Sequence, residues 1–287
     1  MGRKALPGGA SALLNDHMST TAGSRPAAPP RSALRSVAVP TEHGGWGLTS
    51  EPGLLGLLVA PSLAGLCIAL AAMVAFIART PVRIVLVDGR RHRLLGRTRL
   101  AFRVAVLELA VLAGLVVGAV VLTDHRFWVP AAIAAPLLAV ELWYDTRSRS
   151  RRLIPELSGA VAVASVAAMV ALAGGASGEL AAGLWLMLAA RAVSSIPAVR
   201  AQIQRARGRA PQAGVLAVAD GLALGGALAA VALDRTLLAG AFGVAIVVVA
   251  QRIFARGDVP APKVIGLRQM ILGYGLVGVT ALGVALL

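Results

Sequence analysis

The sequence predicts an all-α polytopic membrane protein with about nine transmembrane helices, and three observations support this. The 287 residues are 57% hydrophobic and 14% charged, with a mean hydropathy of +0.79, whereas soluble domains are about 25% charged. Several apolar runs reach about 20 residues, the length that crosses a hydrocarbon core of about 30 Å. Arginine and lysine gather in every second connection between these runs, as the positive-inside rule expects.

The nine predicted helices follow a polar N-terminal segment. Residues 1–38 are rich in Ala, Pro, Ser, Gly and Arg, so we expect a disordered cytoplasmic tail before a helical transmembrane domain over 39–287. Pro52 and Pro61 divide the first apolar stretch into two helices, or else make it one broken, re-entrant element. The predicted helices cover residues 46–62, 63–80, 100–123, 127–144, 156–174, 179–198, 212–233, 236–254 and 266–287.

The basic residues indicate an orientation. Twenty-one of the 28 Lys and Arg residues are assigned to the connections after the second, fourth, sixth and eighth helices, and the alternate connections hold only Arg126 and Arg235. This predicts a cytoplasmic N-terminus and an external C-terminus. The same positive-inside rule explains the net charge of +15, and membrane lipid is the expected partner. Nucleic acid is not an expected partner, because the few aromatic residues do not alternate with the basic ones.

The acidic residues suggest a polar site. Acids are costly inside a bilayer and those present tend to face a cavity or a partner. Nine of the 13 acids lie on the predicted cytoplasmic side, and Glu108 and Asp220 lie about two turns inside their helices. We therefore expect one polar cavity open to the cytoplasm. The alternative is a set of ion pairs that lock helices together, for example Glu108 with Arg103 or Arg191.

The densest polar stretch is "ELWYDTRSRSRRLIPE". Glu141 and Asp145 are four residues apart, so they share a helix face and would hold Mg²⁺, the one cofactor that the sequence indicates. The arginines that follow would pair with phosphate. The alternative is an ordinary helix end with an interfacial Trp143. No motif of a known catalytic class occurs, so catalytic residues are not identified. The predicted ligand-binding residues are Glu42, His43, Glu108, Glu141, Asp145, Arg147, Arg200 and Asp220.

The stretches "PTEHGGWGL", "EPGLLGLLVAPS", "FIARTPVRI" and "YDTRSRSRRLIPELSGA" resemble the YwiC-like family of bacterial membrane proteins, over roughly residues 38–287. The architecture is more distantly similar to the UbiA superfamily of intramembrane prenyltransferases. That similarity implies nine helices, a cytoplasmic cavity, and two Asp-rich motifs that hold Mg²⁺ and a prenyl diphosphate. This chain departs from the motifs, with only Asp88 after the second helix and no acid in "RAQIQRARGR" after the sixth.

Three functions are consistent with these features. The first is a protein of the bacterial cytoplasmic membrane whose polar cavity binds an isoprenoid diphosphate, a phosphorylated lipid or another amphipathic anion, with or without prenyl transfer. The second is a transporter or permease in which Glu108 and Asp220 couple an ion or proton. The third is a structural membrane protein without catalysis. The sequence leaves open whether the protein is an enzyme.

Overall fold

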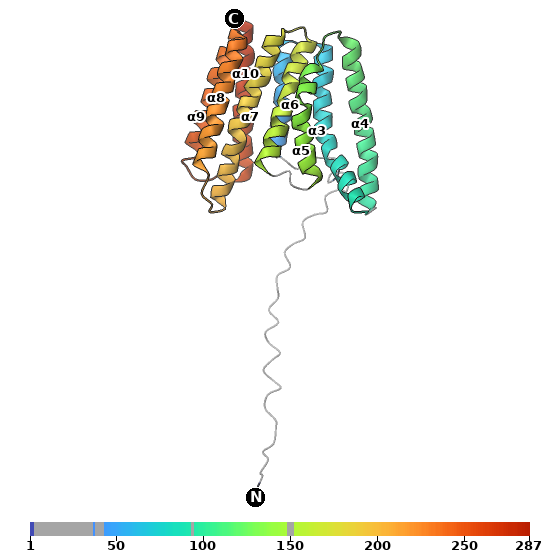
Figure 1. The fold of residues 1–287 in the computed structure, drawn as a ribbon, viewed down its shortest axis with the longest axis vertical. Helices are drawn as coiled ribbons and strands as arrows, with labels where there is room; N and C mark the ends of the chain where they lie inside the picture. Colours follow the sequence, from blue (N-terminus) through green and yellow to red (C-terminus); the bar gives the residue numbers. More distant parts are fainter. Residues whose placement is uncertain (3–36, 38–42, 93–94, 148–151) are drawn as a thin grey trace.

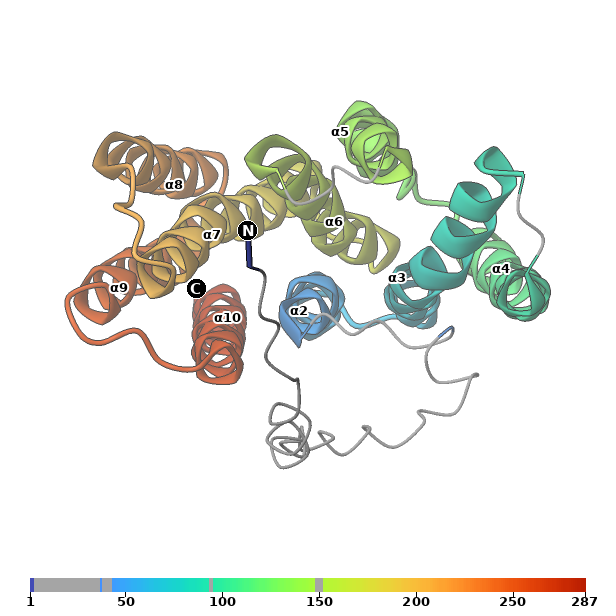
Figure 2. The same ribbon diagram turned by 90° about the horizontal axis from the view of Figure 1, so that it is seen from below.

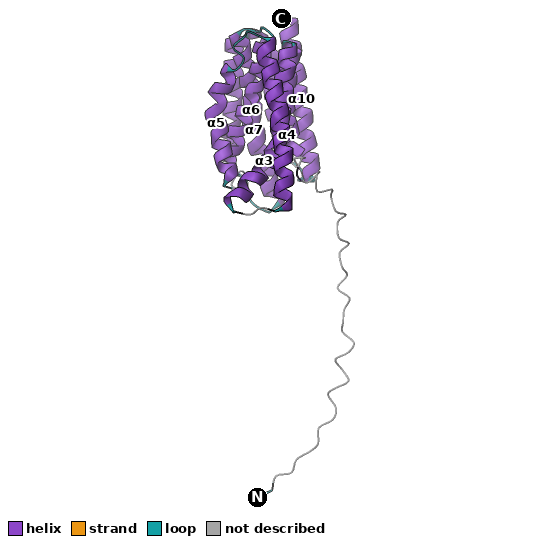
Figure 3. Cartoon of the chain, turned by 90° about the vertical axis from the view of Figure 1, so that its right-hand side faces the viewer, coloured by secondary structure: helices purple, strands orange, loops and turns teal. Residues whose placement is uncertain are grey.

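The computed structural model describes residues 1–2, 37, 43–92, 95–147 and 152–287. These residues form nine α-helices and one short 3-10 turn, and this part of the chain contains no strand (Figure 3). The all-α prediction is therefore confirmed. The helices are α2 (His43–Val59), α3 (Leu63–Arg90), α4 (Gly96–Leu122), α5 (Val129–Thr146), α6 (Leu153–Ala173), α7 (Gly178–Ala206), α8 (Ala213–Leu233), α9 (Leu238–Phe254) and α10 (Pro262–Leu286), with η1 (Arg235–Leu237) before α9.

Each predicted helix has its counterpart, and seven of the described helices, all but α2 and α5, are long and apolar enough to cross a membrane. The main differences lie at the basic ends, where α3 runs on to Arg90 and α7 to Ala206. Arginine is a good helix former, so the helices continue after their apolar stretches end. The chain is a multi-pass membrane protein.

The first apolar stretch is two helices. The break between them contains Pro61 and Ser62, and the Ser62 side chain caps α3 by accepting a hydrogen bond from the Gly65 amide at 2.9 Å, a usual role for an N-cap serine. Pro52, in contrast, lies inside α2. The two prolines therefore act differently, and only Pro61 separates the helices.

The helices are arranged in two rows when the bundle is viewed along its length (Figure 2). One row contains α5, α6, α7 and α8, and the other contains α4, α3, α2, α10 and α9. Small residues let the central helices approach closely: a Cβ at Gly56 of α2 would lie 2.9 Å from the Ala167 carbonyl oxygen of α6. Such small-residue contacts are typical of membrane bundles. The helix α4 packs along α3 at the periphery and exposes many large apolar side chains, as a lipid-facing helix would.

The last residues of α3, α5, α7 and α9 lie at one end of the bundle, the lower end in Figure 1, and the C-terminus lies at the other. We call the lower end the basic end, because most of the arginines are there. Several arginines that we assigned to connections lie within helices, among them Arg90 in α3 and Arg200 in α7, and one of them is deeply buried. Arg191 does not belong to the connection between α7 and α8 but lies within α7, where it is 3% exposed.

Candidate functional site

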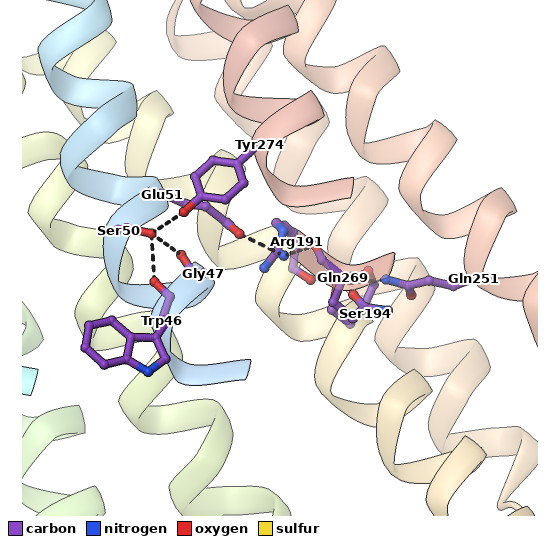
Figure 4. A network of polar contacts seen from close by, with 10 residues as sticks. Trp46, Gly47, Ser50, Glu51, Arg191, Ser194, Gln251, Gln269 and Tyr274 are labelled. Carbon is purple, nitrogen blue, oxygen red and sulfur yellow. Dashed lines mark hydrogen bonds and ion pairs between the residues drawn. The ribbon is translucent and has the colours of Figure 1, made fainter. Parts of the chain in front are cut away.

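Three helices, α2, α7 and α10, meet around a buried ion pair (Figure 4). A carboxylate oxygen of Glu51 on α2, Oε1, lies 3.0 Å from Nη2 of Arg191 on α7. The two residues are 1% and 3% exposed. At 1.5 Å per residue, Glu51 lies about 12 Å inside the basic end of α2. Charged residues this deep in a membrane bundle are costly and mark functional sites.

Glycine on α10 makes room for the pair. A Cβ at Gly273 would collide with both the Glu51 carboxylate and the Arg191 guanidinium. Gly47, one turn before Glu51 on α2, gives space on the other side, because a Cβ there would lie 3.1 Å from Glu51 Oε1. At Gly273 a side chain would require the charged groups to move apart, whereas a Cβ at Gly47 would require the Glu51 carboxylate to shift by only a few tenths of an ångström.

Further hydrogen bonds hold α10 against α7 and α2. Arg191 Nη2 donates to the backbone oxygen of Gln269 at 2.8 Å. The Tyr274 hydroxyl lies 2.7 Å from the Ser50 hydroxyl, and Ser50 Oγ also lies 2.7 Å from the Trp46 carbonyl oxygen (Figure 4). The α10 helix thus supplies a carbonyl and a phenol around the pair.

A line of buried polar side chains extends from Arg191 along α7. Arg191, Ser195 and Gln202 are separated by four and seven residues, so they lie on one face of the helix, and all three are buried. Gln251 of α9 donates to Ser195 Oγ at 2.7 Å. We call Arg191, Ser195 and Gln202 the polar face of α7. It runs from the ion pair toward the basic end.

Several buried polar atoms at the ion pair and toward the basic end have no hydrogen-bond partner among the described residues. They are Glu51 Oε1, Arg191 Nε, and the side-chain oxygens of Gln202, Gln251 and Gln269. The contact between Glu51 and Arg191 is close enough for an ion pair, but it does not have hydrogen-bond geometry. Most buried polar groups in proteins are hydrogen-bonded, so this cluster is where a polar ligand or water would be stabilised.

The predicted metal residues lie elsewhere and already contact arginine. Arg79 of α3 reaches Glu141 at 2.8 Å and Asp145 at 3.2 Å, and Arg83 reaches Asp145 at 3.3 Å. Gly159 of α6 makes room for the Glu141 carboxylate. In the part of the chain that the structure describes, no three His, Cys, Asp or Glu side chains are grouped for a metal. A Mg²⁺ ion between the two acids would have to displace Arg79.

The other predicted residues are spread over the bundle. Asp220 of α8 pairs with Arg252 of α9 at 2.5 Å, and Arg200 of α7 pairs with Glu156 of α6 at 2.8 Å. The Arg147 guanidinium lies 3.5 Å from the ring centre of Trp143. The structure therefore brings Glu141 and Asp145 together, but it does not bring Asp220 or Arg200 to them.

Three predicted residues lack a described side-chain partner for different reasons. Glu108 on α4 is half-buried, and its Oε2 has no hydrogen-bond partner among the described residues. Arg191, one of its two suggested partners, pairs with Glu51 instead. Glu42 lies outside the described residues, and His43 begins α2 with only its backbone described.

The sequence reasoning missed Glu51, Arg191, Gln269 and Tyr274 as parts of one cluster. One signal was available: Arg191 lies inside the apolar run predicted as helix 179–198. An arginine within a membrane span needs a partner, whereas we counted it with the loop arginines. The other three residues carry no such local signal.

Comparison with known proteins gives one match. Residues 39–171 match the family model described as YwiC-like protein. No curated protein and no solved structure matches the chain. The matched segment contains Glu51, Glu141 and Asp145, and Arg191 lies beyond it.

Proposed function

The chain is YwiC-like over residues 39–171, and on that premise we propose that it is a bacterial cytoplasmic membrane protein that binds an amphipathic anion at Arg191. An isoprenoid diphosphate represents this ligand class, and it would enter from the basic end, which we place in the cytoplasm. The observation that carries the proposal is an arginine that is 3% exposed inside an apolar bundle, and whose Nε has no hydrogen-bond partner in the part of the chain that the structure describes.

The chemistry of arginine supports this choice of ligand. A guanidinium binds phosphate through two parallel N–H donors, and burial strengthens such charge-assisted hydrogen bonds. The polar face of α7 leads toward the basic end, where the many arginines would attract an anion. The apolar helices around the pair suit an isoprenoid or acyl tail.

The same helix favours binding from one side over transport. Between its start and Arg191, α7 carries only two residues with polar side chains, Glu179 and Trp185. The Trp185 indole donates to the Val161 carbonyl at 2.8 Å. The polar face of α7 therefore ends at the ion pair, whereas a transporter needs a path on both sides of its site.

The predicted site residues take different roles in this proposal. Glu42, His43 and Arg147 remain proposed contacts at the entrance. The ion pairs of Glu141 and Asp145 with Arg79 favour a role in holding α5 to α3. Binding at Arg191 therefore needs no metal, although Mg²⁺ accompanying a diphosphate would bring its own charge to the entrance.

The test is equilibrium binding of radiolabelled farnesyl diphosphate to the protein in phosphatidylcholine nanodiscs, with and without Mg²⁺. Arg191→Lys keeps the charge opposite Glu51 but loses the planar fork. We expect it to weaken binding about tenfold to a hundredfold, the effect of losing one hydrogen bond to a charged group. The matched control is Arg252→Lys in the ion pair between α8 and α9, which should leave affinity unchanged. Absence of saturable binding, or equal losses in both variants, would contradict the proposal.

A further inference from the structure

The guanidinium of Arg191 has a fixed donor geometry that limits how an anion can bind. Nη2 donates a hydrogen bond to the Gln269 carbonyl oxygen at 2.8 Å, and it lies 3.0 Å from Glu51 Oε1 in an ion pair that lacks hydrogen-bond geometry. Nε, on the same edge of the group, has no hydrogen-bond partner among the described residues. Each bidentate edge of a guanidinium, Nε with Nη2 or Nη1 with Nη2, includes Nη2. A bidentate anion must therefore bind at Nη2, where the Gln269 carbonyl oxygen and the Glu51 carboxylate already lie.

Of these two partners, Glu51 is the easier to displace. The Gln269 oxygen belongs to the backbone of α10 and makes a hydrogen bond with Arg191. The Glu51 contact lacks hydrogen-bond geometry, and a side chain moves by rotation about its own bonds. The incoming anion would also repel the carboxylate.

We propose that an anionic headgroup bound by Arg191 displaces the Glu51 carboxylate, and that Glu51 takes up one proton in the same event. This inference rests on the proposed function. The proton comes from water or buffer at the basic end and bonds to a Glu51 carboxylate oxygen. No bond of the ligand breaks, and the bound state has one proton more than the free protein and free ligand together.

Burial is the reason for the protonation. Glu51 is 1% exposed, and a buried carboxylate without a cation is several kcal/mol less stable than in water. Arg191 of α7 is the charged group that faces Glu51, and Tyr274 of α10 is a further titratable group that faces Arg191. From α3 and α6, the described residues provide no charged group in contact with Glu51. Once Arg191 binds the ligand, no other cation from the described helices balances Glu51.

The polar face of α7 offers the proton a route. Ser195 and Gln202, together with Gln251 of α9, lie between the ion pair and the basic end. The side-chain oxygens of both glutamines have no hydrogen-bond partner among the described residues. Water that satisfies such buried groups commonly makes two to four hydrogen bonds, roughly three on average. A short chain of such waters would connect Glu51 with the basic end.

The test is isothermal titration calorimetry of farnesyl diphosphate binding in nanodiscs, in buffers that differ in ionisation enthalpy. At about pH 8 and above the headgroup is deprotonated, because the second pKa of a phosphate is about 6. The slope of the observed binding enthalpy against the ionisation enthalpy of the buffer therefore counts the protons that the protein takes up. We expect about one proton per ligand for the wild type, so its affinity should fall about tenfold for each unit of rising pH. Glu51→Gln should show no uptake and a flat profile, and the control Glu156→Gln should behave as the wild type.

The outcomes separate the two proposals. Saturable binding without proton uptake, or the same uptake in Glu51→Gln as in the wild type, would overturn the inference and leave the proposed function standing. Absence of binding would overturn the proposed function. Should Glu51→Gln not fold, infrared difference spectra of the wild type decide the question. Ligand should produce the carbonyl stretch of a protonated carboxylic acid, and its absence would overturn the inference.

Discussion

The coupling between Glu51 and Arg191 can be measured with a double-mutant cycle of Glu51→Ala and Arg191→Ala. Each single substitution leaves one charge at a position that is 1% or 3% exposed. Breaking a buried pair in this way lowers the free energy of unfolding by about 3–5 kcal/mol. The double variant leaves no unpaired charge, and its loss is that of a cavity, about 2–5 kcal/mol.

The two single losses therefore sum to roughly 6–10 kcal/mol, and the double variant should fall short of that sum by about 1–8 kcal/mol, or about 4–5 kcal/mol at the middle of the ranges. The comparison pair is Asp220 with Arg252, where the arginine side chain is 42% exposed. Pairs that exposed to solvent typically couple by about 0.2–1 kcal/mol. The difference between the two cycles is thus expected to exceed the error of the measurement.

The assay is equilibrium unfolding of purified protein in mixed micelles by increasing SDS, followed by tryptophan fluorescence. All variants are compared at the same detergent composition, so that the reference state is shared. Two results would refute the description of this pair as buried and interdependent. One is a loss of unfolding free energy below about 1 kcal/mol in each single variant. The other is a coupling energy between Glu51 and Arg191 that is no larger than that between Asp220 and Arg252.

Three further predictions concern packing, metal and orientation. Gly273→Ala should lower the free energy of unfolding by about 1–3 kcal/mol, because the added Cβ collides with both members of the pair. The control is Gly278→Ala, whose Cβ meets no atom within 4 Å. Equal losses in SDS unfolding for the two variants would count against the tight fit at Gly273. Arg79→Gln leaves Glu141 and Asp145 without the guanidinium that they share. Millimolar Mg²⁺ should therefore raise the melting temperature of this variant but not that of the wild type. A similar rise in the wild type would mean that the metal displaces Arg79. The double variant Arg209→Cys, Cys67→Ser has a single cysteine, which should react with an impermeant maleimide only from the cytoplasmic side. Labelling of this cysteine in intact cells would indicate the opposite orientation.

The number and approximate bounds of the helices were predictable because each is an apolar run of about 20 residues, a length that the bilayer sets. The ends of the helices on the basic side were not predictable, because α3 and α7 continue as helices through their arginines. A hydropathy pattern reports where the apolar residues stop, and helix propensity of arginine then extends the helix further.

The site was less predictable, because it depends on how helices distant in sequence are rotated against one another. The positive-inside rule counts arginines by their place in the chain, so Arg191 was grouped with loop residues although α7 buries it. On α10, Gly273 makes room for a carboxylate and a guanidinium, whereas Gly275 and Gly278 of the same helix face open space. Neither sequence spacing nor composition encodes that contact.

The most direct test of binding at Arg191 is a crystal structure of the protein with farnesyl diphosphate, grown in a lipid phase. We predict phosphate oxygens within hydrogen-bond distance of Arg191 Nε and Nη2, with the Glu51 carboxylate no longer against Nη2. An intact contact of 3.0 Å between Glu51 and Arg191, with the headgroup bound instead by the arginines of the basic end, would contradict the account.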